Sequence, residues 1–185
     1  AAFDGKRVCV TGGAGFIGGH LCEALVSLGA HVCIVDDLSA LDASPRDDDA
    51  PDVISTLLES APEQVRFVHA SVLDPHALDD AMERARYVFH LAAVSSVTES
   101  VRDPARTFEV NARGTVEVCS SAQVAGARRI VYAASSSAYG DAGDGPIGES
   151  TPPSPLSPYA ASKLAGEHII TAWDRPFGLS GVSLR

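Results

Sequence analysis

Tyr159 and Lys163 stand four residues apart in the string Tyr-Ala-Ala-Ser-Lys. In a helix this spacing places both side chains on one face, one turn apart. Ser157 and Pro158 precede them as a candidate N-cap and first helical residue, which predicts a helix over 157–173. An ammonium close to a phenol favours the phenolate, so Tyr159 could act as an acid or base near neutral pH. A surface pair without chemistry is the alternative.

Three consecutive serines, Ser135, Ser136 and Ser137, directly follow the apolar run 129–134, which is predicted to be a strand. In an open parallel sheet, ligands bind at the carboxyl ends of the strands. A hydroxyl at this place can hydrogen-bond the reacting oxygen of a substrate beside Tyr159. A serine cluster that only forms a turn is the alternative.

A glycine-rich run at 12–18, Gly-Gly-Ala-Gly-Phe-Ile-Gly, separates the first predicted strand from the first predicted helix. In this context Gly12 permits a tight turn, and Gly15 lets the backbone approach a pyrophosphate at the helix N-terminus. Gly18 allows close packing of the helix on the sheet. The run therefore predicts a dinucleotide site, with a ligand-free turn as the alternative.

Asp36 ends the second predicted strand, eighteen residues after Gly18. A carboxylate at this place can accept hydrogen bonds from an adenosine ribose. Its charge would repel the 2′-phosphate of NADP. The sequence therefore favours NAD as the cofactor.

Strand and helix patterns alternate along the chain. Apolar, β-branched runs predict strands at 7–11, 31–36, 65–69, 87–91, 129–134 and 181–185. Helical spacing predicts helices at 20–28, 53–60, 75–84, 104–125 and 157–173. Buried strands joined by helices indicate an α/β fold with a parallel sheet and right-handed crossovers. The Gly-, Pro- and Ser-rich segment 140–158 is expected to be a surface loop.

The chain has 185 residues, a formal net charge of −10 and 45% hydrophobic residues. The apolar content excludes low-complexity disorder, and the acidic balance argues against a nucleic-acid partner. Neither a membrane span nor a signal sequence is expected. The cysteines, at 9, 22, 33 and 119, have no metal or disulfide spacing, which predicts buried thiols in a reducing cytoplasm.

The segment 39–52 holds five aspartates and two prolines without periodicity. It is expected to be an exposed, mobile loop. It lacks the glycine and terminal glutamate of a calcium-binding loop, so a solvated charge run is favoured over a metal site.

The chain resembles the extended short-chain dehydrogenase/reductase family, and within it the NAD-dependent nucleotide-sugar epimerases and dehydratases. The strings at 11–18, 35–39, 90–93, 134–140 and 157–163 carry the resemblance, together with Asn111. It covers essentially the whole chain. It implies a Rossmann-like doubly wound parallel sheet of strand order 3-2-1-4-5-6 in three αβα layers, with one NAD-binding domain over residues 1–185.

The resemblance also implies roles for individual residues. The catalytic residues would be Ser135, Tyr159 and Lys163. The cofactor contacts would be Gly12, Gly15, Phe16, Ile17, Gly18, Asp36, Asp37, Ser71, Val72, Leu91, Ala92, Ala93, Asn111, Tyr159 and Lys163. The substrate contacts would be Ser95, Ser96, Ser135, Ser136, Ser137 and Tyr159. Ala70-Ser71 replaces the Gly-Asp that the family usually has after its third strand.

The finer resemblance is to UDP-hexose 4-epimerases, including those that accept N-acetylated sugars, which act through a transient 4-keto sugar. Family dehydratases carry Asp-Glu after the catalytic hydroxyl residue, where this chain has Ser136-Ser137. Family members continue past the position of Arg185 into a smaller substrate domain. A non-catalytic NAD-binding fragment and a dehydratase or dehydrogenase therefore stay open as alternatives.

The family commonly forms dimers through helices that correspond to 104–125 and 157–173. Phe108, Thr115, Cys119 and Ala122 follow helical spacing and could form such a contact. A stripe that faces the chain's own core would show the same spacing.

Overall fold

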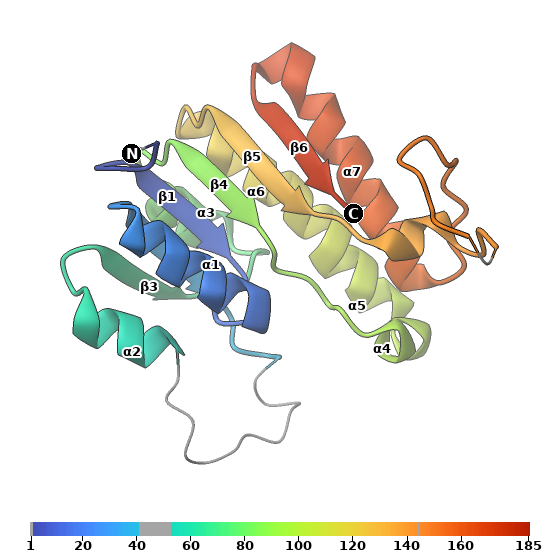
Figure 1. Cartoon of the computed structure of the whole chain (residues 1–185), viewed down its shortest axis with the longest axis horizontal. Helices are drawn as coiled ribbons and strands as arrows, with labels where there is room; N and C mark the ends of the chain where they lie inside the picture. Colours follow the sequence, from blue (N-terminus) through green and yellow to red (C-terminus); the bar gives the residue numbers. More distant parts are fainter. Residues whose placement is uncertain (1, 41–52, 144) are drawn as a thin grey trace.

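The computed structural model describes residues 2–40, 53–143 and 145–185. Six parallel strands form one sheet, in which they lie in the order third, second, first, fourth, fifth and sixth along the chain, with helices on both faces (Figure 1). The expected doubly wound, Rossmann-like α/β fold is confirmed, strand order included. The Asp-rich stretch expected to be mobile lies, from residue 41 to 52, outside the described residues.

The strands are β1 (Arg7–Thr11), β2 (His31–Asp36), β3 (Val65–His69), β4 (Tyr87–His90), β5 (Arg129–Ala133) and β6 (Ser180–Leu184). The α-helices are α1 (Phe16–Ser27), α2 (Val53–Ser60), α3 (Pro75–Ala81), α4 (Val97–Arg102), α5 (Pro104–Phe108), α6 (Gly114–Val124) and α7 (Pro158–Phe177). A π-helical turn, η1 (Glu109–Arg113), joins α5 to α6, and a 3-10 turn, η2 (Ser136–Tyr139), follows β5.

Every predicted strand is present, with ends shifted by at most one residue. Among the helices, α1 begins earlier than predicted, at Phe16, and α3 ends at Ala81. The prediction of one regular helix at 104–125 is wrong in detail, because η1 interrupts its α-helical turns. The short helix α4 was not predicted; it begins after Ser96, whose hydroxyl accepts a hydrogen bond from the Glu99 amide.

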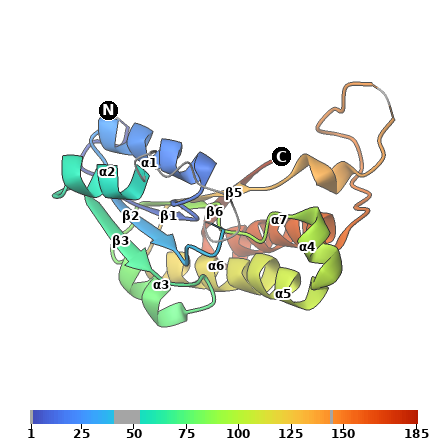
Figure 2. The same cartoon turned by 90° about the horizontal axis from the view of Figure 1, so that it is seen from below.

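Two layers of helices enclose the sheet. Figure 2 shows α1 and α2 on one face, over the β1–β3 half, and α3, α5, α6 and α7 on the other. Alternate residues of β1 serve the two cores: Val8 and Val10 pack with Leu25 of α1, whereas Cys9 packs with Val118 of α6. Both faces of the central strands are therefore buried, as in other parallel sheets.

Helix α7 lies very close to β5. A Cβ atom on Gly166 would collide with the Tyr132 hydroxyl, so only glycine fits at this contact. The helix begins at the predicted N-cap, where the Ser157 hydroxyl accepts a hydrogen bond from the Ala160 amide at 3.1 Å. This packing holds the first turns of α7 against the carboxyl end of β5.

The stripe considered for dimer contact faces the core of this chain. Thr115, Cys119 and Ala122 are fully buried here, so they cannot meet a second copy. Of the four residues of this stripe, only Phe108 has a large exposed fraction, 40%.

All four cysteines are free thiols, as expected. Cys9, Cys22 and Cys119 are buried and Cys33 is half-buried, so the prediction of burial holds fully for three. Burial raises the pKa of Cys22 and of Cys119 to about 12, which keeps both thiols protonated and unreactive. Within the described part of the chain, no helix has the length and apolar character needed to cross a membrane.

Candidate active site

The sequence-predicted residues meet at the carboxyl ends of the strands. The glycine-rich turn follows β1, Asp36 ends β2, segment 91–94 follows β4 and Ser135 follows β5. Because β2, β1, β4 and β5 are neighbours in the sheet, these groups lie side by side at the carboxyl ends of the strands. We call this end of the sheet the crevice.

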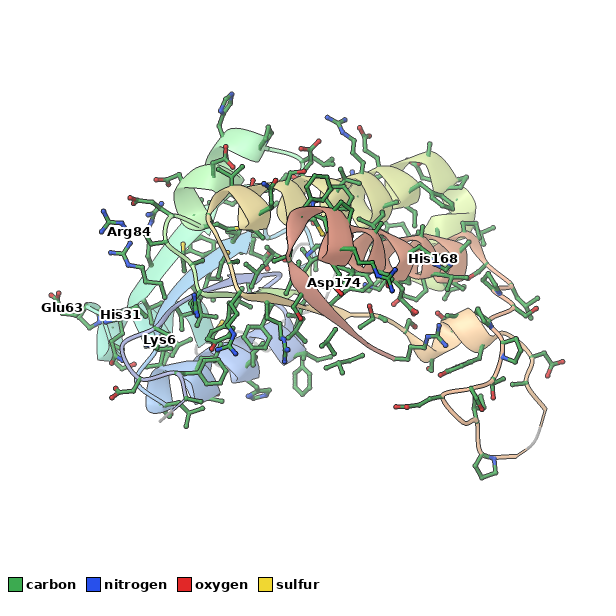
Figure 3. All side chains as sticks on the ribbon, turned by 90° about the horizontal axis from the view of Figure 1, so that it is seen from above. Lys6, His31, Glu63, Arg84, His168 and Asp174 are labelled. Atoms are coloured by element: carbon green, nitrogen blue, oxygen red, sulfur yellow. The ribbon has the colours of Figure 1, made fainter. Side chains whose placement is uncertain are left out.

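The opposite end of the sheet, where the strands begin, carries different groups. Figure 3 shows Lys6, His31, Glu63 and Arg84 together at the amino ends of the strands. A cavity of about 320 Å³ also lies at these amino ends and is lined in part by His31 and Glu63. Ligands of doubly wound sheets bind at the carboxyl ends, so this cavity is not the candidate active site.

The three glycines of the turn differ in what a side chain would meet. Gly12 has φ +74°, and its Cβ would lie 2.5 Å from the Ala92 nitrogen. A Cβ on Gly18 would collide with the Gly12 oxygen. At Gly15 the nearest atom would be the Gly12 oxygen at 3.4 Å, an ordinary van der Waals contact. Gly12 and Gly18 are thus required by the turn and its packing, whereas the protein itself does not require glycine at position 15.

Among the described residues, no side chain caps the first amides of helix α1. Gly15 is the N-cap and makes no side-chain hydrogen bond, and the first turn contains no acidic residue. The side chains of Phe16 and Ile17 are 84% and 68% exposed. Free amides and the positive end of the helix dipole suit an anionic group such as a pyrophosphate.

Asp36 connects this turn to β2. Its carboxylate accepts hydrogen bonds from the amides of Ala14 and Leu38, both at 2.9 Å. Burial raises the pKa of Asp36, and the two amides offset part of that effect. Asp37 is exposed, and its carboxylate accepts hydrogen bonds from the amide and hydroxyl of Ser39 in its own turn. Asp36 is thus the half-buried acceptor at the crevice.

Asn111 lies in η1 and is 1% exposed. Its side-chain oxygen accepts a hydrogen bond from the Val94 amide at 2.8 Å, and its side-chain nitrogen donates to the Val94 carbonyl at 3.0 Å and to the Ser162 hydroxyl at 2.9 Å. The Ser162 hydroxyl in turn donates to the Tyr159 carbonyl at 2.8 Å. Asn111 therefore joins segment 91–94 to the turn of α7 that carries Tyr159.

The three proposed catalytic residues come from two packed elements. The hydroxyls of Ser135 and Ser137 are 2.7 Å apart at the end of β5, and η2 packs against α7. Tyr159 is half-buried in the first turn of α7, close enough to Tyr132 for its charge to act on that phenol. This placement agrees with the expected crevice at the carboxyl end of β5.

Lys163 points into the protein. It is 3% exposed, and its Nζ lies 4.5 Å from the ring centroid of Tyr132. Burial lowers the pKa of Lys163 to about 8, against the opposing effect of Glu167. The spacing predicted an ammonium next to the Tyr159 phenol, whereas Lys163 makes a cation–π contact with Tyr132. The long side chain reaches from α7 onto β5, which the helical spacing alone does not indicate.

Several other predicted residues use their side chains locally. The Ser71 hydroxyl accepts a hydrogen bond from the Leu73 amide at 3.2 Å. Val72 is 4% exposed and packs against Gly114, so its side chain faces the core. Ser95 and Ser136 are exposed, and Ser96 caps α4. Leu91, Ala92 and Ala93 are half-buried beside the glycine-rich turn.

Three residues without a predicted role, His90, Thr11 and Ser162, are connected to the crevice by hydrogen bonds. His90 is fully buried between the hydroxyls of Thr11 and Thr115. One sequence signal could have found it: a histidine that ends an otherwise apolar strand needs hydrogen-bond partners in the core.

Known proteins share this architecture and sequence. Residues 8–185 match the model of the NAD dependent epimerase/dehydratase family. The chain belongs to that family. It is 38% identical to a UDP-glucose 4-epimerase from Mycolicibacterium smegmatis over 177 residues, which cover 94% of this chain and 53% of the relative. A probable dTDP-glucose 4,6-dehydratase from Sinorhizobium fredii is 34% identical over 185 residues, covering 94% of this chain and 50% of that protein.

A solved structure gives the same picture. The UDP-glucose 4-epimerase of Thermus thermophilus, solved as a complex with NAD, superimposes with a TM-score of 0.81 at 35% identity, covering 97% of this chain and 54% of that one. The chain spans about half the length of the curated relatives it matches. The family cofactor is NAD, and the glycine-rich turn, the N-terminus of α1 without a side-chain cap among the described residues, and the Asp36 carboxylate fit it.

Proposed function

We propose that the chain is the NAD-binding domain, over residues 1–185, of a nucleotide-sugar 4-epimerase. The observation that carries the proposal is the placement of Ser135 at the end of β5 and of Tyr159 in the adjoining turn of α7, at the same sheet edge as the glycine-rich turn. The sugar donor is a UDP-hexose or a UDP-N-acetylhexosamine.

The residues act in a short sequence of roles. NAD, when bound, supplies the acceptor and later the donor of a hydride. Tyr159 takes the proton of the sugar 4-hydroxyl and later returns it. The hydroxyl of Ser135, held by Ser137, hydrogen-bonds the same sugar oxygen. Lys163 places a buried positive charge one helical turn after Tyr159, and this charge would favour the phenolate of Tyr159.

Two other functions have specific support. One matched relative is a probable dehydratase, but Ser136 and Ser137 stand where family dehydratases carry an acid pair, and serine cannot do that proton transfer at neutral pH. A non-catalytic NAD-binding module is the second, because the matched relatives are about twice as long and remote binding energy orients a substrate.

The experiment uses the whole chain with NAD⁺ and either UDP-glucose or UDP-N-acetylglucosamine, with separation of the epimers by chromatography. Formation of the 4-epimer without NADH accumulation supports the proposal. Accumulating NADH indicates a dehydrogenase, and NAD⁺ binding without turnover indicates the binding module. Tyr159→Phe should lower turnover at least about 100-fold. Tyr87→Phe, at the amino end of β4, is the matched control and should not.

The proposal extends to assembly and location. A homodimer would form through the helical regions 104–125 and 157–173. Phe108 and Val124, 40% and 75% exposed, offer apolar surface in the first of these regions, and light scattering measures the resulting mass. The four free thiols suit the reducing cytoplasm.

A further inference from the structure

His90 is the last residue of β4 and its ring is fully buried. Its Nδ1 lies 2.7 Å from the Thr11 hydroxyl at the end of β1, and its Nε2 lies 3.0 Å from the Thr115 hydroxyl in α6. The other five histidines of the chain, at 20, 31, 69, 76 and 168, are exposed. His90 is therefore the one histidine with both ring nitrogens held inside the protein.

The direction of these hydrogen bonds follows from their partners. The Thr115 hydroxyl lies 2.6 Å from the Asn111 carbonyl, which can only accept, so Thr115 donates its single proton there. His90 Nε2 must then donate to Thr115. A neutral ring has a bare Nδ1, which accepts from the Thr11 hydroxyl. The Thr11 oxygen faces the Ala92 amide at 3.5 Å.

The electrostatics agree with this assignment. Burial, and then the charge of Lys163, lower the pKa of His90 to about 3. Tyr132 is the other titratable group against the ring, at 5.5 Å between centroids, and burial raises its pKa. The phenol of Tyr132 donates a hydrogen bond to the Lys163 carbonyl at 3.5 Å. Around neutral pH the ring is thus uncharged between two hydroxyls.

The hydrogen-bond path from His90 through Thr115 continues beyond Asn111. The Asn111 carbonyl accepts a hydrogen bond from the Thr115 hydroxyl, and the Asn111 side chain is hydrogen-bonded to Val94 and Ser162. Segment 91–94 is consequently held at two points, at Ala92 by Thr11 and at Val94 by Asn111.

We propose that neutral His90 is a positioning residue. It couples Thr11 and segment 91–94, on one side of the crevice, to the helical segment that carries Asn111. Through Asn111 and Ser162 this coupling reaches Tyr159. Its role is to fix the depth of segment 91–94 against the cofactor. The inference rests on the proposed function only in treating the crevice as the NAD site.

The test is a double-mutant cycle on NAD⁺ binding, measured by calorimetry with the whole chain. Thr11→Val and Thr115→Val each remove one hydroxyl, and each should raise the NAD⁺ Kd about 5-fold. Because both substitutions act through His90, the NAD⁺ Kd of the double variant should rise by much less than 25-fold, the product of the two single effects. A full product, or unchanged affinity in both single variants, overturns the proposal.

A matched control separates positioning from general loss of stability. Thr107 is also fully buried, and its hydroxyl donates to the carbonyl four residues earlier, as that of Thr115 does. Thr107→Val should destabilise the fold to a similar degree and leave the NAD⁺ Kd unchanged. An equal loss of affinity in this variant contradicts the proposal.

Nitrogen NMR on the unmutated chain tests the ring itself. The assigned His90 ring should carry its proton on Nε2, with a bare Nδ1, from about pH 8 to about pH 5. A proton on Nδ1, or titration in this range, overturns the assignment. If the chain binds no NAD⁺ at all, the proposed function fails, and the NMR result still decides whether the hydrogen-bond path exists.

Discussion

The backbone amide of Ala14 donates a hydrogen bond to the Asp36 carboxylate across 2.9 Å. This contact joins the glycine-rich turn to the end of β2, two segments that are far apart in sequence. The group proposed to receive the ribose therefore also sets the shape of the turn proposed to receive the pyrophosphate. Cofactor preference and turn geometry depend on one side chain.

Asp36→Asn should weaken NAD⁺ binding about 10-fold, because a charged acceptor becomes a neutral one. The relative affinity for NADP⁺ should rise, since the charge that repels the 2′-phosphate is gone. Calorimetry with both dinucleotides measures the ratio. Asp37→Asn serves as the comparison and should have a smaller effect, because that carboxylate is exposed and bonded within its own turn. An equal shift in both variants would show that Asp36 has no special position.

Gly15→Ala and Gly18→Ala should fail in different ways. A methyl group at Gly15 meets nothing closer than 3.4 Å, so the unfolding temperature should stay near that of the unmutated chain while NAD⁺ binding falls at least about 10-fold. At Gly18 the methyl group meets the Gly12 oxygen, so stability should fall by about 1–3 kcal/mol. Calorimetric unfolding and NAD⁺ titration measure the two effects. Gly145→Ala, with no atom within 4 Å, is the control. The explanation is wrong if Gly15→Ala binds NAD⁺ normally.

Lys163→Met should stabilise the chain while weakening cofactor binding. The pKa of Lys163 falls from 10.5 to about 8 through burial, which corresponds to a cost of about 3 kcal/mol for the charged form. The unfolded chain binds more protons between pH 8 and 10.5, so the stability of the unmutated chain should rise with pH across that window. The methionine variant should lack this rise. Urea unfolding at several pH values measures the difference, and identical profiles would refute it.

His90 should make the fold sensitive to acid. Its folded pKa of about 3 lies below the ordinary value of 6.5, so the unfolded chain binds the extra proton as pH falls through that interval. The stabilisation is complete above pH 6.5 and is lost progressively towards pH 3, with a slope of up to about 1.4 kcal/mol per pH unit. His90→Asn should remove this component from the acid-unfolding profile, although the variant is less stable at neutral pH. A parallel displacement of the whole profile would mean that His90 does not titrate on unfolding.

The strands and the glycine-rich turn could be predicted from the sequence because their signals are local. β-branched runs bounded by Gly or Asp identify a buried strand without knowledge of its neighbours. Gly18 is likewise required by contacts within the turn itself, although the close contact of Gly12 is with Ala92 after β4.

The parts that escaped prediction depend on contacts across the chain. Lys163 turns towards Tyr132 because Gly166 brings α7 onto β5, and no spacing rule contains that approach. The helix α4 is too short to show a period. Val72 follows the strand whose end faces the crevice, but its side chain fills the space over Gly114.

The wide turn η1 has a consequence for insertions and deletions. A π-helical turn holds one residue more than an α-helical turn of the same height, and each residue of a helix rotates its successors by about 100°. Deleting a single residue between Glu109 and Arg113 would restore a regular α-helix. The change in rotation would move either the Asn111 side chain away from Val94 or Thr115 out of reach of the His90 imidazole. The length of this turn is consequently as constrained as the identity of any side chain within it.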